Sequence, residues 1–209
     1  MESATPLDHF HDKPAARAWV RATLRQLVCA DLAIISRDCA ANVIELIRRR
    51  VTNNPPRIMV YVPFRHEIDP ILVASYAISI GGSVCIGSTS DRGSPLCPIL
   101  IEPEVVRNGV WNITDPVEDA WGAQIPRAHI PADPSTIDAV ITPGMAFDRQ
   151  GGRLGRGAGV YDRFLARLTG PTLRVGIVPS ALLVDRLPTE AHDVRMHAVA
   201  TERDLLIFH

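Results

Sequence analysis

The chain has 209 residues, a length that suits one well-cored domain and is short for two. It is 46% hydrophobic and 22% charged, as ordinary soluble globular proteins are. The formal net charge of −1 gives no reason to expect a broad surface for nucleic acid or membrane. Four cysteines form no CxxC pair, so we expect buried, reduced thiols and a cytoplasmic protein.

The chain begins with a polar stretch, residues 1–13, which we predict to be a flexible arm before a single α/β domain over residues 14–209. The arm lacks the apolar core of a signal peptide, and no later run has the length of a membrane span. Residues 14–50 place Ala, Leu and Ile at steps of three and four, which predicts helix. We expect a break near residues 29–36 to divide this region into two helices.

Strands and helices then alternate along the chain. Compact apolar runs predict strands at residues 57–62, 83–87, 137–142, 173–178 and 197–201, with helices at 69–82 and 160–168. The stretch 88–138, rich in Pro, Gly and Asp, is expected to be irregular and to cover part of a cleft. The alternation predicts a three-layer α/β/α fold with a mostly parallel, Rossmann-like open sheet.

Three polar segments directly follow, or come shortly after, predicted strands. They are PFRHEID (63–69), PGMAFDRQGGRLGRGAGVYD (143–162) and LPTEAHD (187–193). In an open parallel sheet, ligands bind at the carboxyl ends of the strands. We therefore predict that the three segments meet in one site.

The second segment contains a glycine loop with the composition of a phosphate cradle. Five of the residues 151–159 are glycine, which lets backbone N–H groups approach an anion, and Arg153 and Arg156 can bind phosphate oxygens. Asp162, in the first turn of the next helix, would repel phosphates unless a cation lay between, and Mg²⁺ is a natural bridge. The simpler alternative is a flexible loop with Asp162 favoured by the helix dipole. The spacing fits neither a dinucleotide fingerprint nor a Walker loop.

The central segment carries a resemblance to a known family. Residues 143–168 resemble the pattern P-G-x-x-F-D-x-x-G-x-R-L-G-[YR]-G-x-G-Y-Y-D-x-x-L of 5-formyltetrahydrofolate cyclo-ligases, and residues 61–69 and 185–202 resemble the flanking motifs in order. The resemblance covers residues 17–202. It implies ATP-dependent cyclisation of 5-formyltetrahydrofolate to 5,10-methenyltetrahydrofolate, through phosphorylation of the formyl oxygen and release of ADP and phosphate.

The same resemblance implies ATP, Mg²⁺ and a reduced folate as partners. From the net charge we expect no nucleic-acid or membrane partner, and the oligomeric state stays open, with the monomer slightly favoured. It implies catalytic roles for Glu67 and Arg156 and metal binding by Asp162 and Asp193. The ATP-binding positions of the family correspond to Arg17, Arg21, Arg153, Leu154, Gly155, Arg156, Gly157, Ala158, Gly159, Val160 and Tyr161. The folate-binding positions correspond to Val62, Glu67, Arg156, Gly157, Ala158, Gly159 and Val160. Without the family, Arg17 and Arg21 would be interpreted as a solvated helix face, and Val62 as core.

The folate-facing elements depart from the pattern more than the phosphate elements do. Val160 replaces the first of two tyrosines, Arg17 stands for the lysine of a K-x-x-x-R pair, and His197 stands where an aspartate is common. Two hypotheses follow: a working cyclo-ligase, or a relative that binds nucleotide but not 5-formyltetrahydrofolate, as a binding or regulatory module. By fold alone, sugar-phosphate isomerases and CoA transferases are a further possibility, which the long central motif disfavours.

Overall fold

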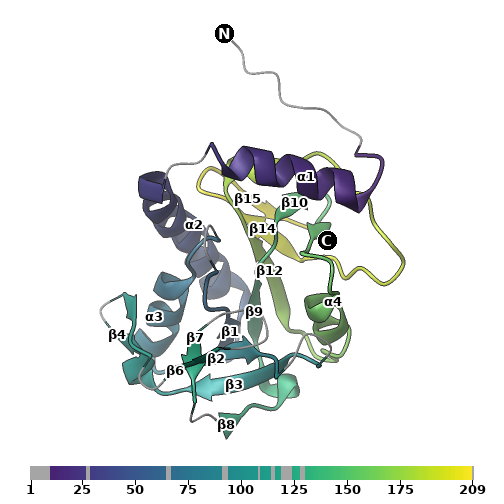
Figure 1. Cartoon of the computed structure of the whole chain (residues 1–209). Coiled ribbons are helices and arrows are strands. Elements are labelled where there is room, and N and C mark those ends of the chain that lie inside the picture. Colours follow the sequence, from purple (N-terminus) through teal and green to yellow (C-terminus); the bar gives the residue numbers. More distant parts are fainter. Residues whose placement is uncertain are drawn as a thin grey trace.

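The computed structural model describes residues 10–26, 29–64, 67–90, 94–107, 109–113, 116–118, 124–127 and 130–208 (Figure 1). Residues 1–9 of the predicted arm lie outside these ranges. None of the helices within them has the length and apolarity that a membrane crossing needs.

Two helices open the described structure, as predicted, but their boundaries differ. Helix α1 (Lys13–Leu24) begins at the last residue of the predicted arm, because the side chain of Asp12 accepts the backbone N–H of Ala15 at 2.8 Å and caps it. Helix α2 (Cys29–Arg50) includes residues 29–36, where we expected the break. That stretch contains neither Gly nor Pro, so nothing in it interrupts a helix.

The main sheet has eight strands in the described part of the chain, in the order β15-β14-β12-β9-β1-β2-β3-β8. Their bounds are β1 (Arg57–Val60), β2 (Ser83–Ser88), β3 (Cys97–Ile101), β8 (Ile130–Pro131), β9 (Ala139–Thr142), β12 (Leu173–Ile177), β14 (Ala198–Ala200) and β15 (Leu205–Ile207). The run β14-β12-β9-β1-β2 is parallel, while β15, β3 and β8 pair antiparallel. The predicted mostly parallel α/β sheet is thus confirmed.

Helices cover both faces of this sheet, as Figure 1 shows. Ile58 and Val60 of β1 belong to the hydrophobic cluster that contains residues of α2 and of α3 (Ile71–Ser79). Met59, which points the other way because side chains alternate along a strand, belongs to the cluster that contains Val20 of α1 and Phe164 of α4 (Val160–Leu165). These two clusters define the three layers expected from the sequence.

Short elements complete the fold. A second sheet has the order β11-β10-β13 in the described residues, and 3₁₀ turns and two hairpins lie elsewhere. Their bounds are η1 (Pro103–Val105), β4 (Val106–Arg107), β5 (Val110–Trp111), β6 (Pro116–Glu118), β7 (Gln124–Pro126), η2 (Pro134–Thr136), β10 (Ala146–Asp148), β11 (Arg153–Leu154), η3 (Ser180–Leu182) and β13 (Leu183–Val184).

The prediction of an irregular segment at 88–138 was wrong for β3, which pairs with β2 from Val84–Ile101 to Ser88–Cys97. The sequence did not indicate this strand because it contains Pro98. Proline has no backbone N–H to donate to a neighbouring strand and usually argues against a strand. Buried Ile99 and Ile101 nevertheless anchor it in the core. Cys39 and Cys85 are buried as predicted, whereas Cys97 in β3 is exposed.

Candidate functional site

A cavity of about 460 Å³, a size typical of small-molecule sites, lies where the three polar segments converge. The segment after β1 contributes Phe64 and Glu67, and the segment after β9 contributes the glycine loop. The third segment contributes Glu190 and Asp193. The predicted meeting of all three segments in one site is therefore confirmed.

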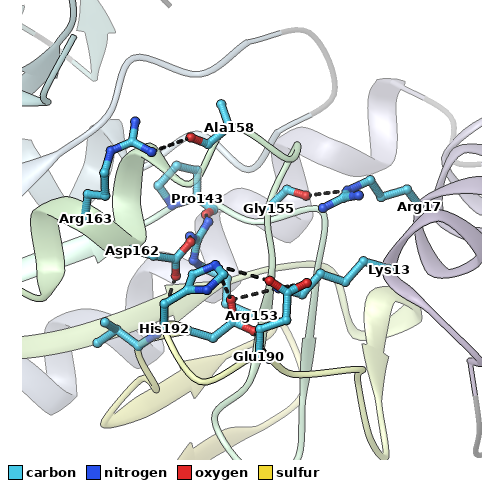
Figure 2. Close-up of polar contacts among 12 residues, drawn as sticks. Lys13, Arg17, Pro143, Arg153, Gly155, Ala158, Asp162, Arg163, Glu190 and His192 are labelled. Carbon is cyan, nitrogen blue, oxygen red and sulfur yellow. Dashed lines mark hydrogen bonds and ion pairs between the residues drawn. The ribbon is translucent and has the colours of Figure 1, made fainter. Parts of the chain in front are cut away.

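The glycine loop forms one wall of the cavity, and two arginine side chains bind its carbonyl groups. Gly157 (φ +108°) and Gly159 (φ +62°) adopt the left-handed region that favours glycine, and Gly159 caps α4. Arg17 Nε donates to the carbonyl of Gly155 at 2.9 Å, and Arg163 Nη1 donates to that of Ala158 at 2.8 Å (Figure 2). Helix α4 has only six residues, so its dipole contributes less than the longer predicted helix would.

Arg153 and Asp162 form a buried ion pair behind the loop. Arg153 Nη2 lies 2.8 Å from Asp162 Oδ2, and the two side chains are 5% and 13% exposed. Arg153 also donates to the carbonyl of Pro143 at 3.3 Å, and its guanidinium lies 5.6 Å from the ring centre of Tyr161. The sequence argument required a cation beside Asp162, and the structure places this arginine there. Repulsion by Asp162 alone is therefore no reason to invoke a metal ion.

A second ion pair, Glu67 with Arg156, joins the glycine loop to the segment after β1. Oε1 of Glu67 lies 2.8 Å from Nη2 of Arg156, and its Oε2 accepts the backbone N–H of Phe64 at 3.0 Å. The Arg156 guanidinium lies 4.6 Å from the ring centre of Phe64. Burial raises the pKa of Glu67 above its ordinary value, although Arg156 and the Phe64 N–H oppose this shift. The pair brings a carboxylate and a guanidinium together at the cavity wall.

Helix α1 contributes two cations to the cavity. Lys13 Nζ lies 2.8 Å from Asp193 Oδ1 and 3.3 Å from Glu190 Oε1, and Arg17 is half-buried beside the glycine loop (Figure 2). Burial by itself would raise the pKa of Asp193, but hydrogen bonds from Lys13 and the Glu190 N–H outweigh it, and the pKa lies below its ordinary value. Arg21 is exposed and is not among the residues that line the cavity.

Most of the predicted site residues line the cavity, and two do not. The residues in the lining are Arg17, Val62, Glu67, Arg153, Gly155, Arg156, Gly157, Ala158, Gly159, Val160, Tyr161, Asp162 and Asp193. Leu154, 1% exposed, packs in the core from β11, and Arg21 lies outside.

The sequence assigned no individual role to the other residues of the lining, although six of them lie within the three predicted segments. These other residues are Lys13, Pro14, Tyr61, Phe64, Gly87, Leu96, Pro143, Gly144, Met145, Glu190 and His192. A signal for Lys13 was available, because Lys13 and Arg17 themselves have the K-x-x-x-R spacing. Tyr61 and Phe64 lie six and three residues before Glu67 in the sequence, whereas nothing in the sequence around Leu96 indicated a place in the site.

The two predicted metal ligands both border the cavity, from α4 and from the third segment. Asp162 Oδ1 accepts only a long contact of 3.5 Å from the Val194 N–H, whereas both oxygens of Asp193 are engaged. In the described ranges, no three or more His, Cys, Asp and Glu side chains are grouped to hold a metal ion. A divalent ion bound here would thus need ligands from a bound molecule or water.

Comparison with known proteins matches this chain to one family. Residues 10–202 match the sequence profile of the 5-formyltetrahydrofolate cyclo-ligase family. A 5-formyltetrahydrofolate cyclo-ligase from Mycolicibacterium smegmatis is 39% identical over 148 residues, which span 70% of this chain and 73% of the relative. A probable 5-formyltetrahydrofolate cyclo-ligase from Caenorhabditis elegans is 24% identical over 90% of this chain and 96% of its own.

The fold also has a solved counterpart. The solution structure of a 5,10-methenyltetrahydrofolate synthetase from Aquifex aeolicus superposes with a TM-score of 0.74 at 22% identity, over 94% of this chain and 93% of that chain. At this identity the likeness shows the shared fold.

Proposed function

This chain is a member of the 5-formyltetrahydrofolate cyclo-ligase family, and we propose that it uses ATP to convert 5-formyltetrahydrofolate into 5,10-methenyltetrahydrofolate. The observation that carries the proposal is the convergence of four cations and a glycine turn on the same cavity as Glu67. The cations are Lys13, Arg17, Arg153 and Arg156.

The glycine loop and its arginines are suited to the triphosphate. Arg156 is exposed to the cavity, and Gly157 and Gly159 allow a close approach of the backbone. From α1, Arg17 contacts the glycine loop at Gly155, and Lys13 lines the same cavity beside Asp193. We propose Lys13, rather than Arg21, as the basic partner of Arg17 in nucleotide binding, because Lys13 lines the cavity and Arg21 does not.

A second part of the cavity lining, the segment after β1, is suited to the folate. Glu67 offers a mostly buried carboxylate to the N–H groups of a reduced pterin, with Val62 beside it in the lining. Val160 also lines the cavity, so the ring that the family carries at this position is replaced by a smaller apolar contact. Stacking of an aromatic pair is worth about 1 kcal/mol, so this change weakens folate binding without abolishing it.

Asp162 and Asp193 are the residues that we propose to hold Mg²⁺ together with ATP. Their carboxylate oxygens are the donors that Mg²⁺ prefers, in a mode where one or two carboxylates join phosphate oxygens and water. The free capacity of Asp162 Oδ1 fits this mode. Bound with ATP, the ion would neutralise charge on the transferring phosphoryl group.

The proposed reaction needs positioning and charge neutralisation rather than a protein nucleophile. The formyl oxygen attacks the terminal phosphorus of ATP, and the bond to ADP breaks. N10 then attacks the activated formyl carbon, and loss of its proton and of phosphate leaves the methenyl bridge. Arg153 and Arg156 would stabilise charge on the transferred group, while Glu67 would hold the pterin.

The test is to mix the protein with Mg-ATP and 5-formyltetrahydrofolate and to follow the near-ultraviolet absorbance of the methenyl product. We expect growth that requires ATP, with an ATP-free sample as control. An Arg156→Gln variant should lose most activity, and Arg149→Gln, whose exposed ion pair with Asp185 is not part of the cavity, should keep it. A flat trace from a protein that binds ATP would instead support the nucleotide-binding relative without this reaction.

A further inference from the structure

The ion pair between Glu67 and Arg156 links the two walls that we assign to different substrates. Arg156 belongs to the glycine loop, and Glu67 lies 89 residues earlier, after β1. The contact is 2.8 Å long, with side-chain exposures of 40% for Arg156 and 21% for Glu67. The carboxylate that we assign to the folate and the guanidinium that we assign to ATP are therefore paired with each other in this structure.

We propose that Arg156 exchanges partners, leaving Glu67 for the phosphates of ATP, and that this exchange couples the binding of nucleotide and folate. The inference rests on the proposed function, because it assigns the two walls to these two substrates. It goes beyond that function by making one ion pair the element through which each ligand senses the other.

The structure separates a fixed arginine from a movable one in the same loop. Arg153 is 5% exposed, bonded to Asp162 and to the carbonyl of Pro143. Arg156 is far more exposed, lies between Gly155 and Gly157, and besides Glu67 packs on the ring of Phe64. A guanidinium that slides along an aromatic face keeps part of its interaction energy, so Arg156 is the one suited to move.

Glu67, the partner that Arg156 would leave, is held in place by the backbone of Phe64. Its Oε2 accepts the Phe64 N–H at 3.0 Å, and the Glu67 N–H donates to the carbonyl of Phe64 at 3.3 Å. Departure of Arg156 would therefore leave a mostly buried carboxylate in place without its cation, which costs free energy. A folate that donates hydrogen bonds to this carboxylate would recover that cost. Nucleotide should thus raise folate affinity, and by linkage folate should raise nucleotide affinity equally.

The first experiment is a double-mutant cycle on nucleotide affinity without folate, measured by calorimetry with a non-hydrolysable ATP analogue and Mg²⁺. Glu67→Gln should tighten binding about fivefold, since Arg156 no longer has to leave a partner; this ratio corresponds to ~1 kcal/mol for a partly exposed ion pair. Arg156→Gln should weaken binding. In the Arg156→Gln background, Glu67→Gln should have no further effect.

Two results would overturn the exchange. If Glu67→Gln tightens binding equally in both backgrounds, the carboxylate merely repels phosphate and the ion pair plays no part. If it changes nothing in either background, the pair is not broken on binding. As a matched control, the same cycle on the exposed pair Arg149–Asp185 should leave affinity unchanged.

A second readout tests the coupling itself. Folate affinity of the wild type should rise about fivefold when the analogue is present, and this rise should vanish in Arg156→Gln. Equal folate affinity with and without analogue in the wild type would refute the coupling. If the protein binds the analogue and forms product but the cycle is additive, only the partner exchange is refuted. If the protein binds no nucleotide, the proposed function is refuted as well.

Discussion

Replacing Asp162 by asparagine should destabilise the protein, although the residue lies at the edge of the cavity. The change leaves the guanidinium of Arg153, 5% exposed and 2.8 Å away, without its counter-charge. Breaking a buried ion pair by removing one partner costs about 3–5 kcal/mol. Asparagine keeps an oxygen that can accept from Arg153, so we expect the lower end, about 3 kcal/mol. For a chain of 209 residues this corresponds to a fall in Tm of about 6–12 °C.

Thermal unfolding without ligands measures this effect directly. The matched control is Asp185→Asn, whose pair with Arg149 is 3.2 Å long and more than half exposed on both sides. That variant should stay within about 0.5 kcal/mol of the wild type. Adding Arg153→Met to Asp162→Asn should recover much of the loss, because it removes the orphaned charge.

An Asp162→Asn protein that melts within about 1 °C of the wild type would refute the reasoning, since it would show that the charge of Arg153 is compensated elsewhere. A double variant no more stable than Asp162→Asn would also contradict it. The prediction matters for the site, because a loss of turnover in Asp162→Asn reports on metal binding only below the melting temperature of the variant.

Three further predictions concern other residues. Arg17→Gln should weaken nucleotide binding about tenfold, which corresponds to loss of one charge-assisted hydrogen bond, whereas Arg21→Gln should bind as the wild type does by calorimetry. Val160→Tyr should tighten folate binding about fivefold if the missing ring weakens that wall, and unchanged folate affinity in a titration would place the pterin elsewhere. Burial, together with Arg174 and Arg50, holds the pKa of His197 below its ordinary value, so the unfolded chain takes up this proton first and stability should fall as pH drops below about 6.5. Denaturant unfolding from pH 7.5 to 5.5 should show a shallower fall in His197→Asn, and identical slopes would exclude this residue as the cause.

The sequence predicted the location of the site better than its internal contacts. Three polar segments after predicted strands had to meet, because the carboxyl ends of parallel strands lie along one edge of a sheet. The pairing within the site depends on distances that no periodicity reveals. Nothing in the loop sequence says that Arg153 turns inward to Asp162 while Arg156 turns toward Glu67.

The helical pattern had a similar limit. Steps of four place Lys13, Arg17 and Arg21 near one face of α1, and the pattern cannot tell which of them reaches the cavity. That depends on how α1 packs against the glycine loop and the third segment, which Arg17 and Lys13 contact. Strand β3 was missed for a different reason: its Pro98, which lies opposite Gly87 of β2, argues against a strand when the sequence is taken alone.

The contacts around the cavity join parts of the chain that are far apart in sequence, and this has a consequence for folding. Lys13 and Asp193 are separated by 180 residues, and Arg17 and Gly155 by 138. Closing such long loops costs entropy before any contact compensates for it, so these pairs belong among the late events of folding. A ligand bound in the cavity should therefore slow unfolding of the native protein while leaving its refolding rate almost unchanged.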